Sequence, residues 1–412
     1  MLKYEVVGNE NYAAQCIRVE RLIDLEGLDN LRGLPWAGYT ALVPKDIGVG
    51  DLVVVFPAEA QLERWVCAGQ NLYAQRNKNI DTTVKGYLGN NGRVRAIRLR
   101  GHTSSALVLP AYAFGNPPEG TVFDTLDGTR VCQKYVLPHK ESRNTGKKDK
   151  NKKRNIPFFP IHYDTAQYFR HQDDIGEEEY VVVTQKLHGT SVRFGRVNVE
   201  RKLSWIERLA KRLGVRVDEW EKELVVGSRK VIKGEASNEN YYDSDIWTEV
   251  ARPYADLIPD NMMVFGEIIG WVGDTPIQKD YTYRIPKGEH ELYVYRVAVV
   301  ADDGAVYDLP WDGVVEFCNN RGMQHVVELA WGTHAELQRE YHDMADFMDQ
   351  DFHNGWNPSA VPLADESPVD EGVVIRWDGG ITPTALKIKG PIFYRHETDI
   401  LDQEVEDIEE EN

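Results

Sequence analysis

The sequence predicts an α+β protein made of two unlike parts: a small all-β barrel and, after it, a larger domain of mixed strands and helices. Short apolar or alternating runs, separated by glycines, occupy residues 16–109, whereas longer strand patterns alternate with helical ones beyond residue 160. Short strands at close spacing are typical of small barrels. A chain of 412 residues is long enough for two or three domains.

In the N-terminal part we predict strands at residues 16–25, 39–43, 52–56, 93–100 and 106–109. The run at 93–100 contains four arginines, and its alternation slips at Ala96 and Ile97, which we interpret as a β-bulge. The arginines form either a solvated face, as exposed charges usually do, or a surface for a nucleic-acid backbone.

In the second part the pattern is mixed. It predicts strands at residues 180–184, 191–195, 263–269, 291–300, 325–329, 372–376 and 384–389, and helices at 203–213, 311–320 and 334–350. In the last helix the apolar residues recur at helical spacing and indicate a core face.

Composition excludes some classes of protein. No apolar run approaches the roughly 20 residues of a membrane span, no signal peptide is recognisable, and the four cysteines are scattered without a Cys-x-x-Cys pair. We therefore expect a cytoplasmic protein, in a host cytoplasm if it is phage-encoded, with reduced thiols and no contact with a membrane. A Walker-type phosphate loop is also absent from the sequence, which disfavours a P-loop ATPase.

The net charge of −18 is unevenly distributed. Residues 397–411 carry nine acidic side chains and no basic one, whereas residues 147–154 carry six basic side chains. The first block predicts a solvated acidic tail. The second predicts a loop or linker that is either a solubilising connector or a contact for RNA phosphates. The global charge therefore does not exclude a nucleic-acid partner.

Lys186 ends an apolar strand and is followed by Gly189, which allows the backbone to turn and approach a phosphate. A lysine attacks phosphorus only in its neutral form, so its usual pKa of about 10.4 has to be lowered by burial and neighbouring cations. Lys387 and Lys389 alternate with apolar residues on another strand, so both project from one face. Alone, that pair would more often be a surface strand.

Two carboxylates, Glu267 and Glu371, lie within or beside apolar strands. A charged residue in such a run needs a partner or a function. Together with the lysines they indicate a metal–nucleotide pocket, because Mg²⁺ prefers a few carboxylates together with waters and substrate phosphates.

These segments resemble the ordered motifs of the covalent nucleotidyltransferases, that is, the ligases and RNA capping enzymes. The Lys-x-His-Gly sequence at Lys186 resembles the nick-sealing RNA ligases, which include phage and kinetoplastid editing enzymes; most other relatives have Asp at the position of His188. The resemblance covers about 230 residues in the expected order. Residues 38–57 and 93–110 resemble the OB-type domain that precedes the catalytic domain in one clade of RNA ligases.

The resemblance implies an N-terminal OB-like β-barrel followed by a mixed α/β adenylyltransferase domain of the ATP-grasp-like nucleotidyltransferase type. The domains would be residues 1–139 (OB-like, RNA-binding), 140–156 (basic linker), 157–396 (adenylation) and 397–412 (acidic tail). We expect no C-terminal OB domain after Lys389, unlike in DNA ligases and capping enzymes.

The resemblance also implies roles for individual residues. Lys186 would be the adenylated nucleophile, Arg229 would contact the nucleotide and the 5′-phosphate region, Glu267 would hold the ribose, and Tyr295 would stack on adenine. Glu371 would position metal-bound waters, so that Glu267 and Glu371 would contact the metal through water, and Lys387 and Lys389 would hold the α-phosphate. The implied catalytic set is Lys186, Arg229, Glu371, Lys387 and Lys389, and the implied nucleotide-binding set is Gln185, Lys186, Leu187, His188, Arg229, Glu267, Tyr295, Lys387 and Lys389.

Three residues depart from the family pattern: Gln185 and Arg296 replace acidic residues, and His188 is not a carboxylate. We expect an ATP-dependent RNA ligase that uses Mg²⁺ or Mn²⁺ and joins RNA 3′-hydroxyl and 5′-phosphate ends through lysyl-AMP and adenylylated RNA, at nicks in duplexes and as a monomer. The alternatives are a DNA ligase, a GTP-using capping enzyme, and a non-catalytic RNA-binding protein with the same fold.

Overall fold

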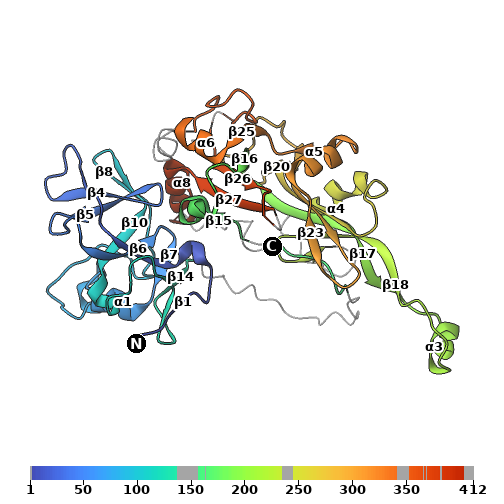
Figure 1. The fold of residues 1–412 in the computed structure, drawn as a ribbon, viewed down its shortest axis with the longest axis horizontal. Helices are drawn as coiled ribbons and strands as arrows, with labels where there is room; N and C mark the ends of the chain where they lie inside the picture. Colours follow the sequence, from blue (N-terminus) through green and yellow to red (C-terminus); the bar gives the residue numbers. More distant parts are fainter. Residues whose placement is uncertain are drawn as a thin grey trace.

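The computed structural model of this chain describes residues 2–136, 156–162, 164–233, 245–340, 352–364, 366–367, 369–380 and 383–402. The basic run at 147–154 and the end of the predicted acidic tail lie outside these residues. Figure 1 shows the strands of the N-terminal part gathered on one side of the molecule, the two larger sheets on the other, and helix α3 protruding far from both.

The N-terminal part consists of short strands. They are β1 Tyr4–Glu5, β2 Ala14–Arg18, β3 Ile23–Asp24, β4 Leu31–Trp36, β5 Tyr39–Pro44, β6 Leu52–Pro57, β7 Ala60–Leu62, β8 Ile97–Leu99, β9 His102–Ser104, β10 Ala106–Pro110, β11 Val122–Phe123, β12 Thr125–Leu126, β13 Thr129–Arg130 and β14 Cys132–Lys134, with helix α1 Arg64–Gly69 and 3-10 turns at Glu10–Tyr12, Arg76–Lys78 and Ala111–Phe114. They form five sheets of two to four strands, and within the described residues none closes on itself. The predicted barrel is therefore not confirmed.

Strand β6 is the centre of this part. It pairs antiparallel with β2 on one side and β10 on the other. Because side chains alternate along a strand, Val54 and Phe56 enter one apolar core and Val53 and Val55 enter another. The strands predicted at 39–43, 52–56 and 106–109 are confirmed, whereas the run 16–25 is divided between β2 and β3.

The strand predicted at 93–100 is mostly wrong. Only Ile97–Leu99 are extended in a sheet, as β8 paired with β9. Arg93 is buried with 2% of its surface exposed, and Val94 and Ala96 are buried too. Their alternation with exposed residues reflects packing of a loop, so the predicted bulge and the continuous arginine face do not exist.

The second part has two larger sheets. The first has the order β15-β27-β26-β16-β25, and the second has β19-β18-β17-β20-β22-β23 with β21 and β24 attached. The strands are β15 Ala166–Gln167, β16 Tyr180–Lys186, β17 Thr190–Glu200, β18 Trp220–Ser228, β19 Ile232–Lys233, β20 Met262–Val272, β21 Thr275–Pro276, β22 His290–Val300, β23 Val306–Asp308, β24 Gln324–His325, β25 Glu328–Thr333, β26 Gly372–Trp377 and β27 Thr384–Lys389. The strands predicted in this part are present except that at 325–329, which is divided between the end of β24 and the start of β25. One large apolar core joins the two sheets.

The helices of this part are α2 Tyr168–His171, α3 Trp205–Arg212, α4 Ile246–Ala251, α5 Trp311–Asn319, α6 His334–Glu340 and α8 Pro391–Asp402, with 3-10 turns at Gln172–Asp174 and Arg252–Tyr254. The helices predicted at 203–213 and 311–320 are confirmed. The third begins at His334 as predicted, and its predicted second half lies outside the described residues. None of the described helices is long and apolar enough to span a membrane.

Helix α8 is absent from the sequence prediction. It contains residues 397–402, where the solvated acidic tail was expected to begin. Phe393 and Thr398 are buried on this helix. The first residues of the predicted tail therefore belong to a helix that packs against the rest of the protein through Thr398.

Candidate nucleotide-binding site

Lys186 is the last residue of β16, opposite Gly372 on the neighbouring strand β26. The turn after it brings β17 against β20, and a Cβ atom at Gly189 would lie 2.2 Å from the carbonyl oxygen of Ile268. Only glycine allows so close a backbone approach. The turn therefore fixes Lys186 at a point where the two large sheets meet.

A cavity of about 150 Å³ adjoins Lys186. Eight of the predicted site residues line it: Gln185, Lys186, Leu187, Arg229, Glu267, Tyr295, Lys387 and Lys389. His188 and Glu371 are outside this lining. The structure thus brings together residues from five segments that are up to 204 positions apart, from Gln185 to Lys389.

Glu371 lies next to Lys186 and Lys389 and is completely buried. Its Oε1 atom is 2.8 Å from the Nζ of Lys186 and 3.0 Å from the Nζ of Lys389. Lys389 also forms an ion pair of 2.5 Å with Glu397 of α8, which lines the cavity. One carboxylate therefore sets the relative positions of the predicted nucleophile and of a predicted phosphate ligand.

The three lysines have different electrostatic surroundings. Burial, followed by the charges of Lys389 and Lys186, lowers the pKa of Lys387 to about 7. Burial alone would lower the pKa of Lys389, but Glu397 and Glu371 outweigh it and raise that pKa well above its usual value. Lys186 differs again, because the buried carboxylate of Glu371 is its ion-pair partner.

Glu267 holds the turn that follows the nucleophile. The backbone N–H of Gly189 donates to its Oε1 at 3.1 Å, and the hydroxyl of Ser191 donates to its Oε2 at 3.3 Å. The carboxylate is almost fully buried, yet it lies on the cavity wall. Such a carboxylate can accept a further hydrogen bond from a ligand hydroxyl.

Tyr295 reaches the cavity because of a β-bulge. In the pairing of β20 with β22, Phe265 is opposite Arg296 and Gly266 is opposite Val294, so Tyr295 is the extra residue. The bulge breaks the expected alternation: Tyr295 lines the cavity, whereas Tyr293 is packed in the core. The hydroxyl of Tyr295 lies 2.9 Å from Nδ1 of His162.

Gln185 and His188 mainly make contacts within the protein. The amide of Gln185 donates to Asp370 at 3.0 Å and accepts from the N–H of Val361 at 2.8 Å. His188 packs edge-on against Tyr281 and Phe393, 3.7 Å from Glu371. Both side chains therefore support the residues around Lys186 and Glu371.

The sequence analysis missed three cavity residues from the N-terminal part: Asn9, Tyr12 and Lys134. The ammonium of Lys134 lies 5.1 Å from the centre of the Tyr12 ring. Asn9 donates to Asp164 at 2.6 Å, and Asp164 forms an ion pair with Arg229. No local pattern marks these residues, since only folding brings them to the cavity.

The acidic residues do not form a protein cage for a metal. Within the described part of the chain, no group of three or more His, Cys, Asp or Glu side chains is arranged to hold one. Glu267, Asp164 and Glu397 nevertheless present carboxylates at the cavity. This set fits a magnesium or manganese ion held largely by phosphates and water. The buried position of Glu371 favours positioning of the lysines over direct contact with an ion.

Comparison with known proteins identifies the family. The model of the RNA ligase family matches residues 179–389, just over half of the chain, and the matched segment contains Lys186, Arg229, Glu267, Tyr295, Glu371, Lys387 and Lys389. The chain belongs to the RNA ligase family. No curated protein matches it.

Solved structures of a Naegleria gruberi RNA ligase have a similar fold. The structure with pyrophosphate has a TM-score of 0.59 at 16% identity and covers 94% of this chain and 99% of that one. A variant with ATP and manganese has a TM-score of 0.60 at 18% identity, with 93% and 99% covered. A variant with AMP and manganese has a TM-score of 0.58 at 17% identity, and the match covers 95% of this chain and 100% of that one. The likeness therefore includes the N-terminal part, which the family model does not match.

Proposed function

We propose that this protein is an ATP-dependent RNA ligase that seals RNA ends, at nicks in duplexes, through a covalent lysyl-AMP intermediate on Lys186. The observation that carries the proposal is the position of Lys186 at the cavity, 2.8 Å from buried Glu371 and beside Lys387 and Lys389. A nucleophile surrounded by cations suits attack on a phosphate, since nucleotidyl transfer depends mainly on positioning and charge neutralisation.

In the first step the Nζ of Lys186 bonds to the α-phosphorus of ATP, and the bond from that phosphorus to the bridging oxygen breaks to release pyrophosphate. The amine has to lose a proton before it attacks, and Glu371 is placed to accept it. Lys387 and Lys389 would stabilise the charge that develops on the α-phosphate. A magnesium or manganese ion, carried by the phosphates and by water on Glu267, would neutralise further charge.

The next two steps transfer AMP and join the ends. An oxygen of the RNA 5′-phosphate bonds to the AMP phosphorus, the phosphorus–nitrogen bond breaks, and Lys186 is regenerated. The 3′-hydroxyl then bonds to the activated 5′-phosphorus, loses its proton, and displaces AMP. Arg229, which pairs with Asp164 at the cavity, would contact the entering 5′-phosphate.

Tyr295 is proposed as the stacking partner of adenine, and Glu267 as the partner of the ribose hydroxyls. Both lie on the cavity wall. We keep the domain division at residues 1–139, 140–156, 157–396 and 397–412 as a proposal, with an OB-like N-terminal domain that binds RNA and with α8 extending into the last segment. The protein is proposed to act as a monomer in a cytoplasm.

The first experiment incubates the protein with α-labelled ATP or GTP and magnesium or manganese, followed by intact mass measurement and peptide mapping. We expect AMP on Lys186, and no adduct on Lys186→Ala. The matched control is Lys45→Ala, an exposed lysine outside the cavity lining, which should retain the adduct. Labelling from GTP alone would indicate a capping-type enzyme, and AMP on another lysine would refute the assignment.

The second experiment identifies the substrate. Pre-adenylylated protein in excess is mixed with four nicked duplexes that have RNA or DNA on either side of the nick. We expect sealing to require RNA on the 3′-hydroxyl side and to tolerate DNA on the 5′-phosphate side, because 2′-hydroxyls and A-form geometry distinguish RNA. If the all-DNA nick is sealed equally fast, the protein is a DNA ligase.

A further inference from the structure

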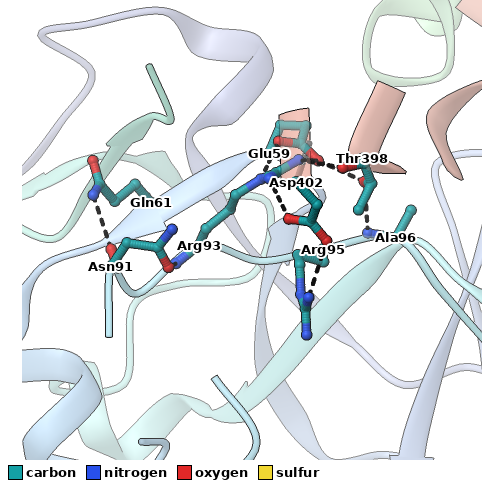
Figure 2. A network of polar contacts seen from close by, with 8 residues as sticks. All are labelled: Glu59, Gln61, Asn91, Arg93, Arg95, Ala96, Thr398 and Asp402. Carbon is teal, nitrogen blue, oxygen red and sulfur yellow. Dashed lines mark hydrogen bonds and ion pairs between the residues drawn. The ribbon is translucent and has the colours of Figure 1, made fainter. Parts of the chain in front are cut away.

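A buried polar network joins the N-terminal part to the end of α8 (Figure 2). The guanidinium of Arg93 forms two hydrogen bonds with Glu59, at 2.6 and 2.9 Å, and an ion pair of 2.9 Å with Asp402. Arg93 and Glu59 have 2% and 6% of their side chains exposed. We call Glu59, Arg93, Thr398 and Asp402 the α8 clamp. Because the charged groups of Arg93 and Glu59 are both removed from water, each buried charge needs the other to compensate for its lost hydration.

Thr398 connects the clamp to the helix backbone. Its hydroxyl donates to Oε1 of Glu59 at 2.7 Å and accepts from the N–H of Ala96 at 3.3 Å, and its carbonyl oxygen accepts from Arg93 at 3.3 Å. No clamp residue lines the cavity. The clamp therefore fixes the position and rotation of α8 without touching the nucleotide site.

The residue before Thr398 is Glu397, whose carboxylate pairs with Lys389 at 2.5 Å. Adjacent residues on a helix point in directions about 100° apart, so Thr398 faces the N-terminal part while Glu397 faces the cavity. A second contact acts on the same lysine: the hydroxyl of Tyr39 donates to the carbonyl oxygen of Lys389 at 2.9 Å. Both the side chain and the backbone of Lys389 are thus held by elements that the N-terminal part positions.

We infer that the α8 clamp is a positioning element for the first chemical step: the clamp orients Glu397, and Glu397 holds Lys389 where Lys389 would meet the α-phosphate. The inference rests on the proposed function. It assigns to residues outside the cavity lining a role in forming lysyl-AMP. Thr398 is a positioning residue in this scheme, since it acts through Glu397 and Lys389.

A double-mutant cycle tests this role. The rate constant of lysyl-AMP formation at saturating ATP is measured in single turnover for the full-length protein and for Thr398→Val, Glu397→Gln and the double variant. We expect Thr398→Val to be slowed about tenfold, with a smaller change in the ATP concentration for half-maximal rate. If Thr398 acts through Glu397, the double variant should be within about twofold of Glu397→Gln alone.

The matched control is Arg18→Ala, which removes an exposed ion pair with Glu119 elsewhere in the N-terminal part and should leave the rate constant unchanged. Thr398→Val deletes one hydroxyl while keeping the side-chain shape, and its folding is checked by thermal melting. A Thr398→Val rate equal to that of the parent, or effects that multiply independently in the double variant, would overturn the inference. Absence of an adduct in the parent protein would instead refute the proposed function itself.

Discussion

Two buried charge clusters in this protein have the same chemistry and different uses. Around Glu371, two lysines pair with one carboxylate beside a cavity. Around Glu59, one arginine pairs with two carboxylates in a region outside any described cavity lining. The first leaves cations next to space for a ligand, whereas the second joins two segments of the chain. Adjacent space, rather than burial or charge, distinguishes the candidate catalytic cluster from the structural one.

The largest expected effect is on stability, from breaking the structural cluster. Arg93→Ala leaves Glu59 buried with its main partner removed, so we expect a loss of about 3–5 kcal/mol in the free energy of unfolding. Urea denaturation of the parent and variant measures it. The exposed pair of Arg18 and Glu119 provides the control, where Arg18→Ala should cost no more than about 1 kcal/mol. Equal costs for the two variants would remove the distinction between buried and exposed pairs.

The cavity cluster should respond to pH through Lys387. Its pKa is about 7 in the folded protein and about 10.4 in the unfolded chain. Between these values the unfolded state binds the extra proton, so the stability contributed by this residue rises with pH. This contribution to stability is fully present above the pKa of Lys387 in the unfolded chain, and it is lost as the pH falls through the folded-state pKa of about 7.

We therefore expect the parent to gain stability relative to Lys387→Met as the pH is raised from 7 to 9, by at most about 1.4 kcal/mol per pH unit. Solvent at this half-buried side chain reduces the slope. Thermal melting of both proteins across this pH range measures the difference. A difference that stays constant with pH would show that Lys387 titrates like an ordinary exposed lysine.

Removal of the ring at Tyr295 tests whether the cavity holds a base. Tyr295→Ala should weaken ATP use by about 1–3 kcal/mol, the usual range for stacking of a base on an aromatic ring. Tyr295→Phe keeps the ring and removes the hydroxyl that contacts His162, so its adduct formation should persist. Apparent ATP affinity, measured from the rate of adduct formation, separates the two. An unchanged affinity in folded Tyr295→Ala would contradict the stacking role.

The smallest effect is expected at the rim of the structural cluster. Arg95 contacts Asp402 at 3.1 Å, but about half of its side chain is exposed. Arg95→Ala should therefore change the free energy of unfolding by no more than about 1 kcal/mol. Chemical denaturation checks this value against Arg93→Ala. A loss as large as that of Arg93→Ala would mean that the rim, and not the buried core, supports the contact with α8.

The sequence predicted the second part better than the first. Strands such as β16 and β20 contain long apolar runs. The pattern of apolar residues along such a strand follows from which of its faces are buried, so the sequence itself reveals the strand. The N-terminal strands are short, and the run at 93–100 alternates because a loop packs Val94 and Ala96 inward. A two-residue strand or an inward-facing loop has no periodic signal long enough to identify.

For the site, local patterns found the residues whose chemistry is set by their own segment: Lys186 before a glycine turn, and Lys387 and Lys389 alternating on β27. They did not indicate which charges each lysine meets: Lys186 pairs with Glu371, whereas burial and the two other lysines lower the pKa of Lys387. They also missed Lys134 and Tyr12, which reach the cavity from the N-terminal part.

By itself, the sequence determined the identity and order of the candidate catalytic residues, because nucleotidyl transfer requires particular side chains at strand ends and close-packed turns. Only the tertiary structure decided their partners: Glu371 between two lysines, Glu397 on an unforeseen helix, and Arg93 joined to Asp402 across 309 positions. The partner of each of these residues depends on distances between segments that are far apart in the chain. Such distances arise from packing of the whole protein, and no local period records them.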